Sequence, residues 1–268
     1  MTNAQDNSDS EIPISRTDPN KGGEGGALQL TNEEFINAVF PTYPEQAFAT
    51  VCSKTSDSRK GGWLAQRADK QMISKFISQI IFDWRDFSNQ TGVFEIRCLG
   101  ENRTTVSQIF TLDAVMDATD LAVRMNANKL NVYMTINPID QNKVTISGKA
   151  AKDVDIVRAH YSFADADDEL GIKGLNELSN LIKPDLVVVT GTIPHERRHA
   201  YWRLTEPCLN LQLWKEKQKQ IATQFKTDKA VVNPSRIMRV AGTVSYPTKN
   251  KLAKGYVQEL VTMRVRSD

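Results

Sequence analysis

Two aspartates separated by one residue end an apolar run in the stretch HYSFADADDEL, residues 160–170. In an extended segment, side chains at i and i+2 point to the same face, so the carboxylates of Asp165 and Asp167 are predicted to converge. Two carboxylates on one face repel each other unless a cation lies between them, and Mg²⁺ or Mn²⁺ prefers oxygen ligands. The pair is a candidate metal site, although acidic residues are also common at the start of a helix such as the one expected to follow.

A second candidate block is VVVTGTIPHERRHAYWRL, in which a histidine precedes a Tyr-Trp pair. If this segment is a strand, its period of two places His199, Tyr201 and Arg203 on one face and the alternate apolar residues on the other. The apolar face is expected to join the core. The polar face would present a hydrogen-bond donor, an aromatic hydroxyl and a cation side by side.

A third block, TDKAVVNPSRIMRVAGTVSYPTKNK, supplies another carboxylate, Asp228, and two arginines three residues apart, Arg236 and Arg239. It ends with Lys249 and Lys251. The planar guanidinium of arginine binds phosphate through two parallel hydrogen bonds. We expect a helix or turn here that leads into a final strand, and on a helix the two arginines would share a face, where a plain solvated surface is the alternative.

The composition is that of an ordinary soluble globular protein of 268 residues, with 40% apolar and 25% charged residues. No apolar run reaches the roughly 18 residues that span a bilayer, and the N-terminus lacks the apolar core of a signal peptide. We therefore expect a cytoplasmic protein with no membrane partner. Cys52, Cys98 and Cys208 lie far apart without CxxC spacing, which predicts neither a zinc site nor disulfides.

Positive charge is concentrated in the last part of the chain. Residues 194–268 contain 15 Lys and Arg against 6 Asp and Glu, a difference of +9, and because the whole chain carries +2, the preceding part carries −7. Such asymmetry favours a polyanionic partner, either nucleic acid or nucleotide phosphates. A solvated basic helix with Lys215, Lys217 and Lys219 accounts for part of it.

Residues 1–27 are expected to be disordered because they are too polar to bury enough surface, and residues 28–268 are expected to form one domain. A capping box predicts a short helix that starts near Thr31. Hydrophobic periodicity predicts further helices over 63–88, 112–128, 170–182 and 209–225, and strands over 47–52, 92–100, 103–111, 129–138, 156–165, 185–191 and 199–204. The interleaved order predicts an α/β or α+β fold in one mixed-sheet domain.

Several other residues carry weaker expectations. Tyr133 and its neighbours at i+2 and i+4 would line a pocket from an adjacent strand, although exposed strand faces often carry such residues. Trp84 and Trp214 lie in helical patterns and are expected to pack in the core. His160 is expected to be a satisfied structural histidine rather than a ligand.

Taken in order, the three blocks resemble the motifs of the archaeo-eukaryotic primase superfamily, in particular the primase-polymerase domains of plasmid, phage and mobile-element replication proteins. The resemblance covers about residues 90–258 and is strongest from Tyr161 to Lys251. YSFADAD fits the first motif, HAYWRL the second, and the aspartate ahead of RIMRVAGT the third. The resemblance implies a mixed-sheet catalytic core with one half like an RNA-recognition motif.

The resemblance also implies roles for individual residues. Asp165, Asp167 and Asp228 would bind two catalytic Mg²⁺ or Mn²⁺ ions, and no zinc is expected. The nucleotide and its phosphates would be bound by His199, Arg236, Arg239, Tyr201 and Arg203. The DNA would be contacted by Lys249, Lys251, Arg197 and Arg198.

Two departures from the family pattern leave alternatives open. The usual short turn before the motif histidine is replaced by TGTIPHERRH, so His195 is a rival to His199, which we prefer for its spacing to the Tyr-Trp pair. Asn233 stands where many relatives have another aspartate, which weakens the position of Asp228 as the third carboxylate.

The implied activity is that of a DNA-dependent primase-polymerase, which makes or extends primers on single-stranded DNA from nucleoside triphosphates by two-metal nucleotidyl transfer. A helicase domain or subunit is a further expected partner, and the chain is then a fragment of a longer protein. The alternative is a non-catalytic origin- or strand-binding module. A rolling-circle nickase needs two histidines separated by one apolar residue, whereas His195 and His199 are four apart.

Overall fold

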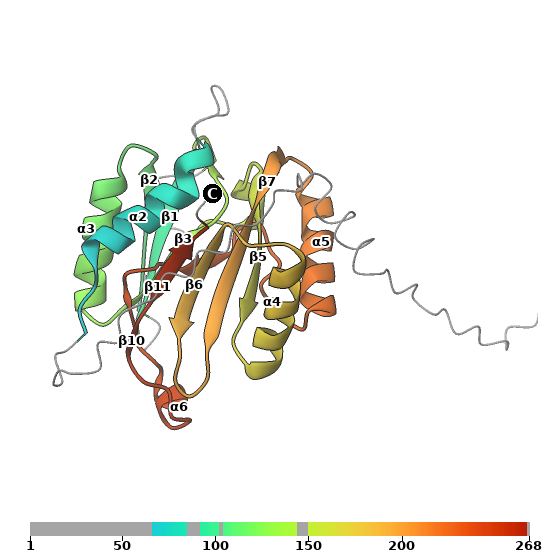
Figure 1. The fold of residues 1–268 in the computed structure, drawn as a ribbon. Coiled ribbons are helices and arrows are strands. Elements are labelled where there is room, and N and C mark those ends of the chain that lie inside the picture. The colour runs from blue at the N-terminus through green and yellow to red at the C-terminus, as the bar shows by residue number, and fades with distance from the viewer. Residues whose placement is uncertain (1–65, 85–91, 102–103, 144–149, 267–268) are drawn as a thin grey trace, which may run out of the picture.

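The computed structural model describes residues 66–84, 92–101, 104–143 and 150–266. The expected tail, the helix near Thr31 and the strand over 47–52 lie outside these residues. Within them the chain has an α+β fold (Figure 1). The helices are α2 Lys70–Ile81, α3 Val115–Ala127, α4 Glu169–Leu181, α5 Leu211–Gln224 and α6 Lys249–Leu252, with 3-10 segments η1 Phe82–Trp84 and η3 Asp153–Asp155.

The strands form two larger antiparallel sheets and one small one. They are β1 Gly92–Leu99, β2 Thr105–Thr111, β3 Asn131–Thr135, β4 Ile139–Asp140, β5 Ala159–Ala166, β6 Leu186–Gly191, β7 Arg197–Cys208, β8 Ile237–Arg239, β9 Val244–Ser245, β10 Glu259–Leu260 and β11 Thr262–Val265. The first sheet has the order β2-β1-β3-β8 with β4 beside β1, the second sheet has the order β11-β6-β7-β5, and β10 pairs with β9. The expected α+β fold class is confirmed, and every described strand pairing within it is antiparallel.

Helices cover the second sheet on one side, and the main core lies on its other side. Figure 1 shows α4 and α5 together at one side of the molecule and α2 and α3 at the other. The alternation of β5 explains the two layers: Phe163 joins the core shared with the first sheet, whereas Ala164 and Ala166 pack with Trp202 against α4 and α5. Residues on the Phe163 face of β5 therefore point toward the first sheet.

The stretch after β5 resolves the two interpretations of its acidic residues. Asp168 is the N-cap of α4, and its Oδ1 accepts a hydrogen bond from Gly171 N at 2.7 Å. Asp165 lies within β5, and Asp167 lies between the strand and the cap. Asp168 thus caps the helix, whereas Asp165 and Asp167 remain candidates for metal binding.

The segment around the two arginines differs from the expectation. Residues 237–239 form strand β8 rather than a helix, because Met238 and Val240 alternate into the core while Arg239 points the other way. Arg236 lies in the turn before the strand, where its N–H donates to Asn233 O at 3.1 Å. The expectation of a shared helical face for the two arginines was therefore wrong.

The remaining elements follow the sequence with smaller differences. The helix expected over 63–88 is confirmed over 70–81, and the strand expected over 185–191 is β6, which alternates between buried and half-buried residues before its buried end. Trp84 and Trp214 are buried in the core as expected. His160 is buried and accepts a 2.8 Å hydrogen bond from Arg158 Nε, which confirms its structural role. In the part of the chain that is described, no helix is both long and apolar enough to cross a membrane.

Candidate active site

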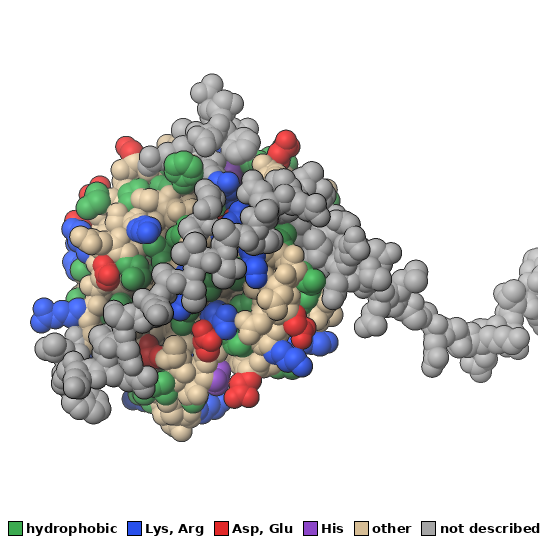
Figure 2. Space-filling view, in the orientation of Figure 1, with side chains coloured by type: hydrophobic (Ala, Val, Ile, Leu, Met, Phe, Trp, Pro, Cys, Tyr) green, Lys and Arg blue, Asp and Glu red, His purple; other side chains and the backbone are tan. Residues whose placement is uncertain are grey.

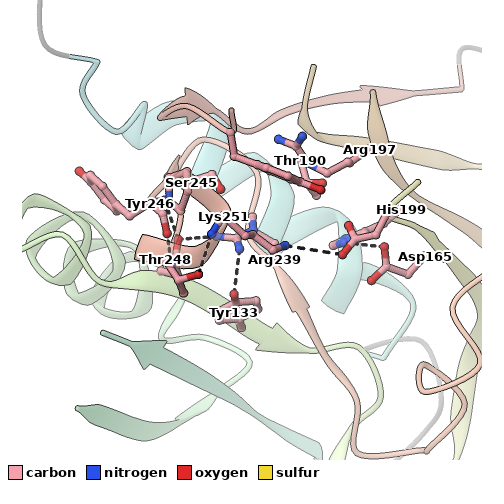
Figure 3. A pocket seen from close by; sticks show the side chains of 14 residues that line it. Tyr133, Asp165, Thr190, Arg197, His199, Arg239, Ser245, Tyr246, Thr248 and Lys251 are labelled. Atoms are coloured by element: carbon pink, nitrogen blue, oxygen red, sulfur yellow. Dashed lines mark hydrogen bonds and ion pairs between the residues drawn. The ribbon is translucent and has the colours of Figure 1, made fainter. Parts of the chain in front are cut away.

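The pairing of β5 with β7 brings Asp165 and His199 together. They are directly opposite in the antiparallel register, and His199 Nε2 lies 3.6 Å from Asp165 Oδ1 (Figure 3). This distance is longer than a hydrogen bond. On the other side of the ring, His199 Nδ1 lies 3.3 Å from the hydroxyl of Tyr201, which shares its face of the strand as predicted.

Asp165 is electrostatically strained. Its Oδ1 is buried and has no hydrogen-bond partner among the described residues. Burial and the neighbouring charges of Asp167 and Asp228 raise its pKa well above the usual range, against the opposing effect of Arg239 and Arg236. A buried carboxylate oxygen with no partner is expensive unless a cation binds it.

Asp167 lies at the mouth of the same pocket and is exposed. Its Oδ2 is 3.8 Å from Lys251 Nζ, and its backbone carbonyl is 2.7 Å from His195 Nε2. His195 therefore holds the backbone beside the carboxylates, whereas His199 lies on the pocket wall itself. Of the two rival histidines, His199 is the one that the fold places toward Asp165.

Asp228 lies beside this pair but does not line the pocket. Its backbone N–H donates to Asp165 O at 2.8 Å, and its exposed carboxylate accepts a hydrogen bond from Ala230 N at 2.8 Å. No group of three or more His, Cys, Asp or Glu is arranged to hold a metal within the described ranges. The partnerless oxygen of Asp165 and the adjacent Asp167 fit a hard divalent cation, whereas the Asp228 carboxylate is bonded to Ala230 N outside the pocket lining.

The opposite wall of the pocket comes from the first sheet. Arg239 on β8 lies across from Tyr133 on β3, and its guanidinium donates to the Tyr133 hydroxyl at 2.8 Å and to Asn131 Oδ1 at 2.6 Å. The charge of Arg239 acts on the pKa of both Asp165 and His199. The two sheets therefore place a cation and a pair of carboxylates on facing walls.

The pocket between these walls has a volume of about 250 Å³. Figure 3 shows side chains from both sheets and from the segment after β9 directed toward it. Its lining residues are Asn131, Tyr133, Asp165, Asp167, Thr190, Arg197, His199, Arg239, Ser245, Tyr246, Pro247, Thr248, Lys251 and Tyr256. In the orientation of Figure 1, Lys and Arg side chains gather in the middle of the face turned toward the viewer (Figure 2).

Two residues of the second block are buried more deeply than the sequence suggested. Tyr201 is 0% exposed and lies behind His199 rather than on the pocket surface. Arg197 was expected to contact DNA, but it is 5% exposed and pairs with Glu259 Oε2 at 3.0 Å. It also donates to Ile193 O at 2.7 Å, so its guanidinium is already held inside the protein.

The other candidates lie outside the pocket lining. Arg203 is exposed farther along β7, where its backbone N–H donates to Asp185 Oδ2 at 2.7 Å. Arg198 forms an ion pair with Glu196, and Lys249 is exposed at the start of α6. Arg236 is half-buried, and its Nε has no partner among the described residues.

Sequence reasoning missed several parts of the site. Asn131 lies two residues before Tyr133, so the same period of two would have placed it on the pocket face. Tyr246 lies inside the third block and Tyr256 and Glu259 follow it, and none of the three carries a comparable signal. Only the tertiary structure brings the two tyrosines to the pocket and Glu259 to Arg197.

The sequence matches no protein-family model and no curated protein. Among solved structures, the chain is similar to the AEP domain of the primase-polymerase of cyanophage S-2L, with 20% identity over 74% of this chain and 91% of that one, at a TM-score of 0.49. It is also similar to primase RepB′ (16% identity, 72% and 56% covered, TM-score 0.48) and to the catalytic domain of primase RepB′ in complex with initiator DNA (17%, 73% and 83%, 0.47). These structural neighbours are primases and a primase-polymerase.

Proposed function

We propose that this protein is a DNA-dependent primase-polymerase that makes or extends primers on single-stranded DNA. The observation that carries the proposal is the meeting of Asp165, Asp167, His199 and Arg239 at one pocket, in the order in which the sequence motifs place them. In the reaction, the 3′-oxygen attacks the α-phosphorus of a nucleoside triphosphate, the bond to the β-phosphate breaks and pyrophosphate leaves. The side chains of this pocket match the charges that such a step develops.

The carboxylates of Asp165 and Asp167 would hold divalent Mg²⁺ or Mn²⁺. When bound, these cations supply the positive charge that lowers the pKa of the 3′-hydroxyl and neutralises the triphosphate. The unpartnered oxygen of Asp165 supports this role, because a bound cation would satisfy it. Asp228 is proposed to join the pair only if its exposed carboxylate turns from Ala230 N toward Asp165.

His199 and Arg239 would bind the phosphates from two sides. Burial lowers the pKa of His199 to about 4; the charge of Asp167 acts against this shift and the charge of Arg239 adds to it, so the imidazole is neutral at pH 7. A neutral imidazole donates a hydrogen bond from one ring nitrogen, and a phosphate oxygen is a suitable acceptor. Arg239 would contribute a full positive charge, and Arg236, at the entrance to β8, would act on the template side.

The template would lie along the basic surface beside the pocket. Lys251 lines the pocket rim, and Lys249 is exposed on the same short helix α6. Phosphate contacts of this kind give sequence-independent, salt-dependent binding to single strands. Arg198 is the remaining candidate for this surface, and a helicase domain or subunit remains a proposed partner.

The proposal is tested by incorporation of labelled nucleotide on unprimed and on primed single-stranded DNA, with Mg²⁺ or Mn²⁺. The wild type is compared with the double variant Asp165→Asn, Asp167→Asn, and with Asp120→Asn, which changes an exposed carboxylate on α3 as a matched control. We expect metal-dependent product from the wild type and the control, and none from the double variant. Single-strand binding should persist in all three proteins.

Each outcome discriminates between functions. Product on unprimed template identifies a primase, and product on primed template alone restricts the activity to a polymerase. No product from the wild type on either template, despite measurable DNA binding, would overturn the proposal in favour of a non-catalytic strand-binding module.

A further inference from the structure

The guanidinium of Arg239 is held by neutral partners. Tyr133 and Asn131 accept its hydrogen bonds at 2.8 and 2.6 Å, and the guanidinium carbon lies 4.8 Å from the centre of the Tyr133 ring. Among the described residues, no carboxylate lies within ion-pair distance of Arg239. By contrast, Arg97 and Arg197 pair with Glu95 and Glu259.

The choice of neutral partners has an electrostatic consequence. A carboxylate partner would cancel most of the positive charge before it reached the pocket, whereas an amide oxygen, a phenol oxygen and an aromatic face fix the geometry and leave the charge in place. The charge of Arg239 does reach across the pocket, because it lowers the pKa of both Asp165 and His199.

Asn131 also joins Arg239 to the segment after β9. While its Oδ1 accepts from Arg239, the same atom accepts from Tyr246 N at 2.8 Å, and its Nδ2 donates to Tyr246 O at 2.9 Å. Tyr246 is followed within a few residues by α6, which carries Lys251 to the pocket, where its Nζ lies 3.8 Å from Asp167 Oδ2. A single amide thus fixes one cation directly and anchors the segment that carries another.

We propose that Asn131 and Tyr133 are positioning residues that form a neutral cradle for Arg239, and that this cradle sets the affinity of the pocket for the triphosphate of the nucleotide. The inference rests on the proposed function for the identity of the ligand. Holding the arginine in place before binding reduces the ordering cost when phosphate arrives, and keeping it unpaired preserves its attraction. Loss of the cradle should therefore weaken ground-state binding of the triphosphate more than it slows the chemical step.

The test measures binding of inorganic tripolyphosphate to the full chain by calorimetry. Asn131→Asp keeps the shape of the side chain but places a carboxylate against Arg239, and Tyr133→Phe keeps the ring but removes the acceptor. Asn142→Asp, on an exposed turn after β4, is the matched control for added charge. We expect affinity to fall about tenfold or more in Asn131→Asp and about threefold in Tyr133→Phe, and to stay unchanged in the control.

A double-mutant cycle separates positioning from a general structural effect. In an Arg239→Met background, Asn131→Asp should cause a much smaller further loss of tripolyphosphate affinity, because only the repulsion from the new carboxylate and the loss of the Nδ2 bond to Tyr246 O remain. An equal loss in both backgrounds, or unchanged affinity in both single cradle variants, would overturn the inference. In the labelled-nucleotide assay, the cradle variants should raise KM with a smaller change in kcat.

Failure of this inference can be distinguished from failure of the proposed function. A wild-type protein that binds no tripolyphosphate contradicts the cradle directly. If tripolyphosphate binding depends on the cradle but no nucleotide is incorporated, the role of the cradle is supported and the polymerase proposal is overturned.

Discussion

The two sheets build facing walls of one pocket in different ways. On the first sheet, Asn131, Tyr133 and Arg239 satisfy one another through short hydrogen bonds. On the second sheet, Asp165 has a buried oxygen without a partner in the described structure, and its nearest polar neighbour across the pairing, His199, is 3.6 Å away. The polar groups of the first wall are satisfied, whereas Asp165 on the second wall has an unsatisfied oxygen.

Under the proposed function, the difference between the walls has a simple meaning. Local violations of hydrogen-bonding rules persist where they serve function, because the rest of the structure holds them in place. The first wall would hold the guanidinium of Arg239 ready for phosphate, whereas Asp165 on the second wall would gain its missing interaction when a metal ion binds. The contrast predicts opposite responses of stability to substitutions on the two walls.

The largest expected effect is that of Asp165→Asn on catalysis. Loss of this carboxylate removes several kcal/mol of charge stabilisation, so nucleotide incorporation should fall roughly a thousandfold. The same change removes a charge whose burial, together with repulsion from Asp167 and Asp228, raises the pKa of Asp165, so the melting temperature should rise. Incorporation assays and thermal unfolding, with Asp120→Asn as control, check both results. A lower melting temperature for Asp165→Asn would contradict the interpretation that the Asp165 carboxylate is strained.

The ion pairs of the two regions provide a second contrast. Arg197 and Glu259, at the second sheet, have side chains only 6% and 12% exposed, whereas Lys70 and Asp120, which join α2 to α3, are 51% and 57% exposed. Glu259→Gln leaves a buried charge without its partner and should cost about 3 kcal/mol of unfolding free energy. Lys70→Met should cost less than about 1 kcal/mol. Urea unfolding measures both, and equal costs would refute the distinction.

Two glycines with similar backbone conformations test packing around the first sheet. Gly242 has φ of 86° and Gly255 has φ of 84°, but a Cβ on Gly242 would lie 2.7 Å from Asp69 O, whereas one on Gly255 would meet nothing within 4 Å. Gly255→Ala should therefore cost only the left-handed strain, about 1 kcal/mol. Gly242→Ala adds a backbone clash at the start of α2 and should cost about 3 kcal/mol in the same unfolding assay. Similar costs for the two substitutions would mean that α2 shifts and relieves the clash at residue 242.

The parts of the site that follow from local periodicity were predictable from the sequence. The period of a strand placed Asp165 and His199 on pocket-facing positions, and only one alternative for each remained. Arg239 was found for its spacing, but its setting was not predictable, because a four-residue RIMR segment fits a helix by its i,i+3 arginines and a strand by its alternation. Packing of Met238 and Val240 against the core decided for the strand.

Long-range contacts account for what the sequence could not predict. Arg197 was expected at the surface, yet Glu259, 62 residues later, binds it in the interior. A Cβ at Gly191 would lie 1.7 Å from its guanidinium, so the absent side chain there makes room for it. No local pattern encodes a pairing between residues so far apart in the chain.

The last expected effect concerns pH and the two histidines of the second sheet, of which only His199 faces the pocket. Burial, followed by the nearby charge of Arg158, lowers the pKa of His160 to about 3 from a usual 6.5. The unfolded chain therefore binds a proton at pH 5 that the folded protein does not, so stability falls as the pH drops below 6.5. The contribution is about 2 kcal/mol at pH 5.

His160→Gln keeps an acceptor for Arg158 Nε and removes the titration. Because both proteins share every other ionisable group, the difference between their unfolding free energies at pH 7 and pH 5 isolates this histidine. We expect the wild type to lose about 2 kcal/mol more than the variant over that interval, measured by urea unfolding. An identical loss in both proteins would contradict the lowered pKa of His160. It would show that the folded protein accepts the proton on His160 by giving up the contact with Arg158 without unfolding.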